Sequence, residues 1–330
     1  MVLWLIAAFA LSVNPGPETL EAVDLYGLRT LPEAAVRAAV GLAAGDPTPD
    51  SIGDIRLRLL RLPGVAEVDV AAVCCGEKGG SILYVGVRET GTLALSFRAA
   101  PTGEDRLPAE ITAAGERLQA ALVDAVRRGA TGEDASHGYA LAADSALRAV
   151  QEEFLTLAAA RFDLLASVLR SSSDASHRSL AAEIIAYGHE RPLVLGELLH
   201  AVRDPSEDVR NNATRALALL AGWANENPDA GLTFPGSVFV DFLNSVSWTD
   251  RNKGVFVLFP LTASRDPALL AELRSRAVPS LVEMARWSNA GHAMLPFILL
   301  ARVVGVDDAE AFQAWQSGQR ETIIARAGSF

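Results

Sequence analysis

The 330-residue sequence contains only two cysteines, and this scarcity excludes several classes of small protein. Disulfide-dense secreted scaffolds and most structural zinc sites need more cysteine than this chain has. The chain is also short of positive charge, with 29 Lys and Arg against 40 Asp and Glu and a formal net charge of −11. Because phosphate backbones repel such a chain, we expect no nucleic-acid partner.

Long apolar runs and catalytic motifs are missing as well. Beyond the N-terminus, no run reaches the roughly 18 apolar residues of a membrane-spanning helix, so we expect no integral membrane domain. The sequence has no phosphate-binding GxxxxGK[ST], no GxSxG, no HExxH and no GxGxxG followed by the expected acidic residue. These absences favour a protein that is not an enzyme and that holds neither a cofactor nor a metal.

What the sequence does contain is typical of a folded protein. Half of its residues are hydrophobic and 21% are charged, which is enough apolar surface to build a core. At about 150 residues per domain, a chain of this length favours two domains.

The first residues, MVLWLIAAFALSV, carry no charged side chain. Ala8-Phe9-Ala10 offers a small-x-small cleavage pattern, and Asn14-Pro15-Gly16-Pro17 follows and breaks any helix. We therefore predict a signal segment over residues 1–16 and a periplasmic or secreted location. The alternative is a buried first helix or strand, and the pattern leaves open whether the segment is cleaved or retained.

Residues 18–90 predict a small α+β domain in the order β-α-α-β-β. Alternating apolar residues predict strands over 21–26, 65–73 and 81–87. Helical spacing predicts helices over 31–42 and 52–62. Because each strand is expected to have one apolar face, the two helices should cover one face of a three-stranded sheet.

Four short motifs in this region carry a resemblance: Val23-x-x-x-Gly27, Gly45-Asp46, Leu62-Pro63-Gly64-Val65, and a strand that closes at Glu89. In this order they resemble a polypeptide-transport-associated (POTRA) domain over roughly 70 residues. The resemblance implies a periplasmic domain that binds other proteins, often by adding a strand to the edge of its sheet.

The two cysteines, Cys74 and Cys75, are neighbours at the end of the second predicted strand. One interpretation is a redox-active disulfide between adjacent residues, which strain disfavours because ordinary disulfides hold their Cα atoms farther apart. The other interpretation is a pair of small residues, one of which faces the core.

Residues 91–145 predict a connector with one strand, over 92–98, and one helix, over 108–128. Glu133, Asp134 and His137 follow within five residues and are the best local cluster for acid–base chemistry. They support the alternative function of an acid–base or metal-assisted hydrolase. The simpler interpretation is a polar loop that caps the next helix.

Residues 146–330 predict an all-α array of repeated helix pairs. Residues 162–187 and 194–219 share a helix-turn-helix pattern in which Arg178 precedes Arg210 by 32 residues. Further helices are expected over 237–246, 251–261, 269–287 with a kink at Pro279, 293–304 with an interruption at Pro296, and 309–325. The last of these has the more polar face that a terminal cap requires.

The second unit resembles a HEAT repeat of the ARM-type fold, with Asp204-Pro205 at its turn and Val209-Arg210 at the start of its second helix. The arginine of such a repeat should reach the preceding repeat's aspartate. Together with the segments 250–253 and 283–287, this unit resembles uncharacterised bacterial exported HEAT-repeat proteins, a resemblance that implies an α-solenoid and no assigned activity.

Six polar residues at the starts of second helices are candidates for binding: Arg210, Asn211, Asn212, Arg251, Asn252 and Lys253. If these helices line the inside of a solenoid, the six form a polar strip on its concave surface. The competing interpretation is a ladder that satisfies the ends of neighbouring helices.

These features together predict a non-enzymatic adaptor or scaffold of the bacterial cell envelope. We expect it to bind a protein or peptide partner through the concave repeat surface, the edge of the POTRA-like sheet, or both. The hydrolase remains the alternative, and a structural envelope component that holds other proteins is a third hypothesis, supported by the fold analogy alone.

Overall fold

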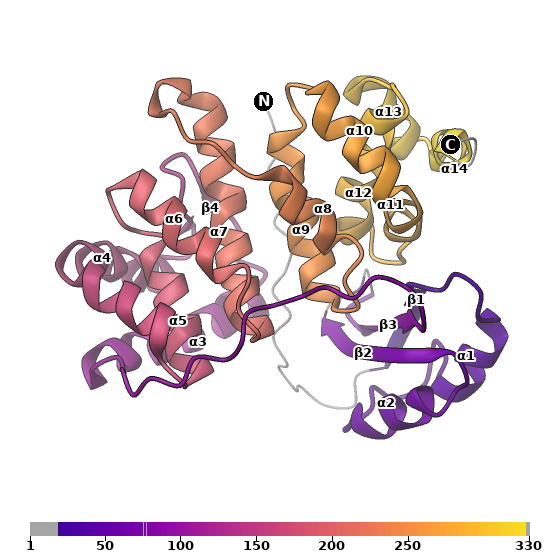
Figure 1. The fold of residues 1–330 in the computed structure, drawn as a ribbon, viewed down its shortest axis with the longest axis horizontal. Helices are drawn as coiled ribbons and strands as arrows, with labels where there is room; N and C mark the ends of the chain where they lie inside the picture. The colour runs from indigo at the N-terminus through magenta and orange to yellow at the C-terminus, as the bar shows by residue number, and fades with distance from the viewer. Residues whose placement is uncertain (1–18, 75, 77, 328–330) are drawn as a thin grey trace. The chain divides into compact units, whose positions relative to one another are not determined.

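The computed structural model describes residues 19–74, 76 and 78–327, and its contacts divide the chain into two units (Figure 1). Unit 1 combines the residues up to Leu95 with those from Gly236 onward, and unit 2 is Ser96–Pro235. This division differs from the expected boundaries near residues 90 and 145. The predicted signal segment over residues 1–16 lies outside the described residues, as does Cys75.

The N-terminal part of unit 1 has the predicted order β-α-α-β-β. Its elements are β1 (Leu20–Tyr26), α1 (Glu33–Val40), α2 (Gly53–Leu60), β2 (Val65–Cys74) and β3 (Ser81–Glu89). β3 lies in the middle of the sheet, parallel to β1 and antiparallel to β2. Cys74, the last residue of β2, is disulfide-bonded.

One face of this sheet packs on α1 and α2, as the periodicity predicts. Val36 and Leu59 from the helices are fully buried against Leu83 and Val85 of β3 and Val68 of β2. At about 25 cal/mol per Å² of apolar surface removed from water, such side chains supply most of the stability of this layer.

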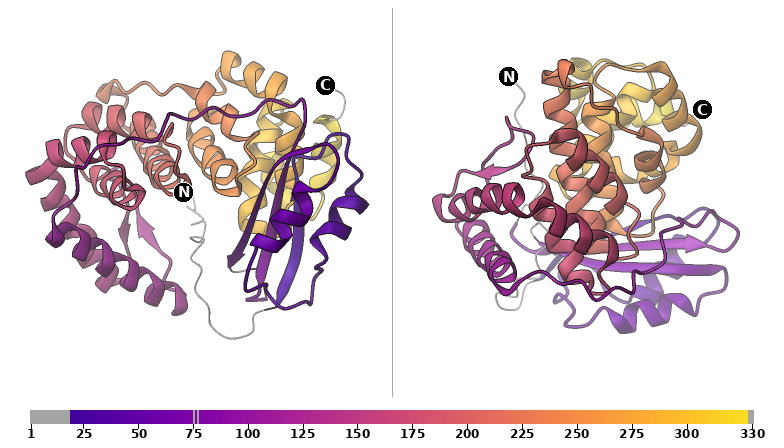
Figure 2. Two further views of the ribbon diagram at one scale, coloured as in Figure 1. Left: turned by 60° about the horizontal axis from the view of Figure 1, so that its bottom comes forward. Right: turned by 60° about the vertical axis from the view of Figure 1, so that its left-hand side comes forward.

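The second face of the sheet is also covered, and here the expectation of a single covered face is wrong. Tyr84 is completely buried and stacks on Trp248, with ring centroids 5.2 Å apart, and its hydroxyl lies 2.8 Å from Nδ1 of His292. Figures 1 and 2 show the sheet between the α1–α2 pair and the C-terminal helices. Burial, aided by the nearby Lys253, lowers the pKa of His292 to about 3, so this histidine is neutral near pH 7.

Glycine makes this close approach feasible. A Cβ atom at Gly86 of β3 would lie 2.1 Å from the carbonyl oxygen of Val246 and 2.6 Å from the ring of Tyr26. The Tyr26 hydroxyl donates a hydrogen bond of 2.8 Å to that same carbonyl. The sheet therefore meets the turn before α9 through direct backbone contact.

The C-terminal helices of unit 1 are α8 (Gly236–Phe242), α9 (Trp248–Leu261), α10 (Pro267–Arg276), α11 (Val278–Ala285), α12 (Ala290–Val303), α13 (Asp308–Gln316) and α14 (Arg320–Ala327). The single helix expected over 269–287 is two helices, because Ala277 is non-helical and Pro279 lies in the first turn of α11. The terminal helix expected over 309–325 is also two, divided near Gly318 at a φ of 71°.

The interruption expected at Pro296 is also wrong, because α12 continues through this residue. Pro296 and the residues that follow it in α12 are buried. Their packing offsets the hydrogen bond that the proline ring removes.

Unit 2 contains α3 (Ala109–Arg127), the hairpin β4 (Glu133–Asp134) and β5 (Leu141–Ala142), then α4 (Ser145–Ser171), α5 (Ala175–Ile185), α6 (Arg191–Ala201) and α7 (Glu207–Glu226), with a short 3-10 turn, Pro228–Ala230. The strand expected over 92–98 does not form. Its alternating residues find no partner strand among the described residues, and Leu93 remains 77% exposed. No helix in the described part of the chain is long and apolar enough to cross a membrane.

The helix pairs in both units repeat one arginine contact. Arg178, Arg210 and Arg251 each lie near the start of a second helix, and each donates a hydrogen bond to the carbonyl six residues earlier. The three side chains are buried, with exposed fractions of 2%, 4% and 2%. This shared contact agrees with the ladder interpretation, because it satisfies carbonyls at the turn between helices.

The direction of the inter-repeat ion pair differs from the expectation. Arg178 donates to both carboxylate oxygens of Asp204, at 2.9 and 2.8 Å. Its partner therefore belongs to the following repeat and not to the preceding one. Asp204 is fully buried and also accepts a hydrogen bond from the backbone N–H of Ser206, which places it at the turn where the sequence pattern put it.

Candidate functional site

The six residues predicted to bind lie in two different units. In unit 2, Arg210 is buried and its guanidinium lies 3.8 Å from the ring centre of Phe97. Asn212 is half-buried and donates to the backbone oxygen and the hydroxyl of Ser179, while Asn211 donates to the side chain of Asn212. Asn211 and Asn212 therefore keep part of their surface for a partner, whereas Arg210 does not.

In unit 1, the other three residues follow one another at the start of α9. Arg251, Asn252 and Lys253 are only 2%, 2% and 5% exposed. Three consecutive helical residues point in directions about 100° apart, so they share no common face. Of these three, Arg251 lines a cleft that is described below, and the predicted polar strip as a whole stays a prediction.

The three residues of the alternative acid–base cluster contact different partners. Glu133 is ion-paired with Arg215 of α7, and Asp134 accepts a hydrogen bond from the backbone N–H of Ser136. The backbone and side chain of Ser136 lower the pKa of Asp134. His137 is exposed and stacks on Tyr139, and it forms no hydrogen bond with either carboxylate in the part of the chain that the structure describes. Within that part, no group of three His, Cys, Asp or Glu residues is arranged to hold a metal ion.

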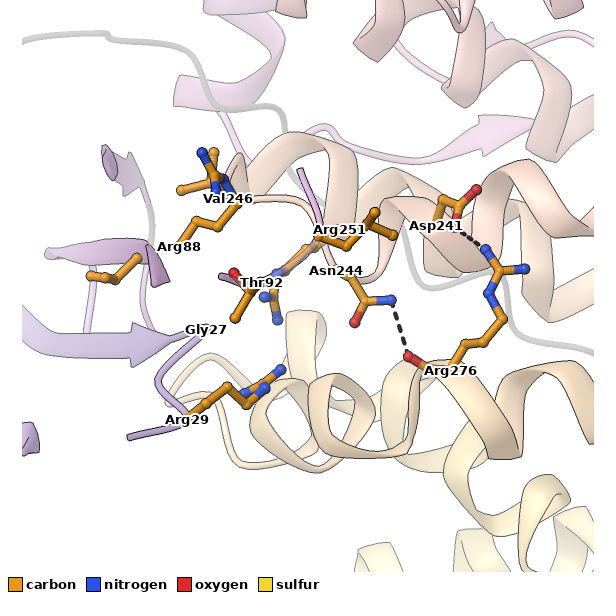
Figure 3. Close-up of a pocket in the computed structure, with 11 residues that line it drawn as sticks. Gly27, Arg29, Arg88, Thr92, Asp241, Asn244, Val246, Arg251 and Arg276 are labelled. Carbon is orange, nitrogen blue, oxygen red and sulfur yellow. Dashed lines mark hydrogen bonds and ion pairs between the residues drawn. The ribbon is translucent and has the colours of Figure 1, made fainter. Parts of the chain in front are cut away.

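A cleft of about 260 Å³ in unit 1 is the best-defined candidate site (Figure 3). We call it the arginine cleft, because guanidinium groups from four elements line it. Its lining residues are Gly27, Arg29, Val87, Arg88, Thr92, Leu93, Asp241, Asn244, Val246, Arg251 and Arg276. The cleft lies where β1 and β3 end, beside α8 and α9.

Glu283 of α11 determines the electrostatics of the cleft. Its carboxylate is ion-paired with Arg29 and accepts hydrogen bonds from the Arg251 guanidinium at 2.9 Å and from the backbone N–H of Gly27 at 3.1 Å. Two guanidinium groups thus share one carboxylate.

The loop that carries Arg29 is fixed by a second carboxylate, that of Glu89 at the end of β3. It accepts hydrogen bonds from the backbone N–H groups of Arg29, Thr30 and Leu31, at distances from 2.6 to 3.0 Å. Burial raises the pKa of Glu89, but these bonds and one from the Thr30 hydroxyl outweigh it and lower the pKa to about 2.

Gly27 permits the close approach of β1 and β3 at the cleft. Its φ of 83° is rare for residues with a side chain, and a Cβ atom there would lie 2.2 Å from the carbonyl oxygen of Val87. The backbone conformation and the close packing therefore explain why glycine is the last residue of the motif Val23-x-x-x-Gly27.

Arg88 and Arg251 keep terminal Nη donors that no described residue accepts from. Arg88 donates through Nε to Glu67, at 2.8 Å, and its two Nη atoms make no hydrogen bond to any described residue. Arg251 uses Nε and Nη1, and its Nη2 likewise bonds to none of the residues described. Arg276 differs, because Asp241 and Glu272 both pair with it. In Figure 3, Arg276 and Asp241 lie together on the opposite side of the view from Arg88.

A second candidate surface is the outer edge of β2. The sheet order leaves β2 with β3 on one side only. Between Ala66 and Val73, the backbone forms no hydrogen bond to any described backbone group other than those of β3. Ala66 and Glu67 are exposed, and Ala71 and Ala72 are half-buried.

Sequence reasoning found Arg251 but missed Arg29, Arg88 and Arg276. The three missed arginines lie far apart in the sequence, in the loop after β1, in β3 and in α10. The one local indication was the acidic and aromatic segment 283–287, which contains Glu283.

Comparisons with solved structures find distant likenesses to designed and engineered proteins. No family model and no curated protein matches the sequence. A designed armadillo repeat protein is similar at 17% identity and a TM-score of 0.35, covering 57% of this chain and 93% of that one. An engineered protein is similar at 17% identity and a TM-score of 0.38, covering 56% and 90%. A designed armadillo repeat protein in complex with the peptide (KR)4 is similar at 15% identity and a TM-score of 0.36, covering 59% and 97%.

Proposed function

We propose that this protein is a non-enzymatic adaptor of the bacterial cell envelope that binds an extended segment of a partner protein along the outer edge of β2. The observation that carries the proposal is that β2 lies at the edge of the sheet and pairs with β3 alone among the described strands. An edge strand with free N–H and C=O groups is a template for one further strand.

The side chains of β2 support this mode of binding. Val68 and Val70 are buried against α1 and α2, so the strand is held in place from one face. Asp69 points to the other face, where the backbone N–H of Trp248 donates to it at 3.4 Å. Because both faces are fixed, β2 can accept a strand at its edge without rearrangement, which lowers the entropic cost of binding.

The helices of unit 2 have a different part in this proposal. The half-buried Asn211 and Asn212 offer amide groups for a second contact with the partner, as the sequence suggests. The envelope location rests on the uncharged N-terminal run, and the absence of catalysis rests on the separate contacts of Glu133, Asp134 and His137.

Site-directed photo-crosslinking tests the proposal. A photoreactive residue in place of Ala66, on the edge of β2, should crosslink one partner protein in the cells that produce this chain. The matched control replaces Ala35, an exposed alanine of α1, and should give no such product. A third variant at Asn212 tests the helical surface.

The outcomes separate the two surfaces. A specific product from Ala66 that disappears when Ala72 is changed to Pro supports strand addition, because the N–H of Ala72 faces away from β3 and proline removes this donor from the outer edge. Products from Asn212 alone would contradict the proposal and would assign binding to unit 2. A hydrolase screen on the protein and on His137→Ala tests the enzyme alternative, and equal background activity is the expected result.

A further inference from the structure

We infer that the arginine cleft of unit 1 binds an organic carboxylate that carries a small apolar group. This site is separate from the β2 edge and from the proposed adaptor function. The free end of a peptide and a free short-chain acid share this chemistry, and the experiment below distinguishes them.

The first argument is the state of Arg251. Its side chain is 2% exposed, and Nε and Nη1 are held by the carbonyl of Ser245 and by Glu283. Its Cζ lies 4.5 Å from the ring centre of Tyr26, and this cation–π contact helps to hold the guanidinium in place. Nη2 is therefore a positioned donor, in a partly dehydrated setting where a hydrogen bond to an anion is strong.

The second argument is the supply of charged hydrogen-bond donors in the cleft. Arg29 and Arg251 share the single carboxylate of Glu283, and Arg88 presents two unused Nη groups from the neighbouring strand. A carboxylate in the cleft would accept hydrogen bonds from these Nη groups. The long-range field of a chain with a net charge of −11 opposes any anion, so the attraction must be local, as it is here.

The third argument decides between a carboxylate and a phosphate. The cleft is also lined by Val87, Leu93 and Val246, whose apolar surface a bare phosphate would leave uncovered. Asp241 lies in the same wall, and it would repel a dianion more strongly than a monoanion. A monoanionic carboxylate with an apolar body matches both features.

Titrations followed by NMR test the inference on the full chain. The probes are N-acetyl-leucine, its uncharged amide, isovalerate and inorganic phosphate. We expect N-acetyl-leucine to shift the backbone signal of Gly27 saturably, and the amide to leave it unchanged. Tighter binding of N-acetyl-leucine than of isovalerate would identify a peptide terminus as the ligand, and equal binding would identify a free acid.

The matched variants are Arg88→Gln and Arg286→Gln. Both arginines are in partly exposed ion pairs of 2.8 Å, Arg88 with Glu67 and Arg286 with Glu321, so both variants should fold. Arg88→Gln should weaken N-acetyl-leucine binding by roughly tenfold, because it removes a charge-assisted contact. Arg286→Gln, outside the cleft, should not weaken it.

Three results would overturn the inference. These are equal binding of the amide, tighter binding of phosphate than of either carboxylate, and equal weakening by Arg88→Gln and Arg286→Gln. Loss of crosslinking at Ala66 would leave the inference standing, since that experiment tests the edge of β2 alone.

Discussion

Arg178 in unit 2 and Arg251 in unit 1 hold the same position in their repeats but have different partners. Each donates to the carbonyl six residues earlier and each is 2% exposed. Arg178 binds both carboxylate oxygens of Asp204, which Arg98 also contacts at 3.4 Å, and all three guanidinium nitrogens of Arg178 are bonded. Arg251 shares Glu283 with Arg29 and keeps one donor atom unused.

The difference follows from what each helix pair packs against. The second helix of Arg178 meets another repeat, whose turn supplies Asp204. Arg251 pairs with Glu283 of α11, and the sheet of unit 1 adds Gly27 and Arg29 as further donors to that carboxylate. A position that only stabilises the fold in one unit thereby borders a cleft in the other.

The largest expected effect is in unit 2. Asp204→Ala leaves the guanidinium of Arg178 buried and unpaired, so we expect it to lower the free energy of unfolding by about 3–5 kcal/mol. Urea unfolding measures the change. Asp208→Ala, at an exposed position of the same helix start, is the matched control and should cost less than about 1 kcal/mol. Equal losses in the two variants would contradict the assignment of Asp204 as the inter-repeat partner.

The second effect concerns the loop that supports Arg29. Glu89→Gln removes charge-assisted hydrogen bonds and should cost about 1.5–3 kcal/mol at pH 7. Because the pKa of Glu89 is lowered in the folded state, its contribution is fully present above the pKa of the unfolded chain, near 4.5, and declines as the pH falls toward about 2.

Unfolding measured from pH 7 to pH 2 checks this sign. The gap in stability between the wild type and Glu89→Gln should narrow below pH 4.5. A gap that stays constant down to pH 2 would contradict the role given to Glu89.

The third effect tests the contact between the sheet and the helices of unit 1. Gly86→Ala forces a Cβ atom into the carbonyl of Val246 and should cost about 1–3 kcal/mol. Gly196→Ala, in helix α6 of unit 2, meets nothing within 4 Å and should stabilise by about 0.5–1 kcal/mol. Thermal unfolding of both variants measures the difference, and two effects of the same sign would count against this packing.

Local patterns predict the elements of this fold well. The β-α-α-β-β order is confirmed, because alternation and helical spacing are properties of neighbouring residues. The burial of the second face of β3 was not predicted. Ile82, Tyr84 and Gly86 nevertheless alternate with Leu83 and Val85 in a continuous apolar run. Such a run is typical of a strand buried on both faces. Its partner helices begin about 150 residues later in the sequence, where no short-range pattern connects them to β3.

The arginine cleft shows the same limit of local patterns. Arg29 and Glu283 are 254 positions apart, and only the packing of the sheet on the C-terminal helices brings them together. The repeat pattern did identify Arg251, because its spacing from a turn matches that of Arg178 and Arg210. It could not show that Arg251 keeps one guanidinium nitrogen unused among the described residues, whereas Arg178 uses all three.

The most direct test of this comparison follows the side-chain Nε–H signals of Arg178 and Arg251 by NMR during a titration with N-acetyl-leucine. Our account predicts that the Arg251 signal shifts saturably, in parallel with Gly27, while the Arg178 signal does not move. Two unmoved signals, or equal shifts of both, would contradict the claim that one repeat position stabilises unit 2 and binds a ligand in unit 1.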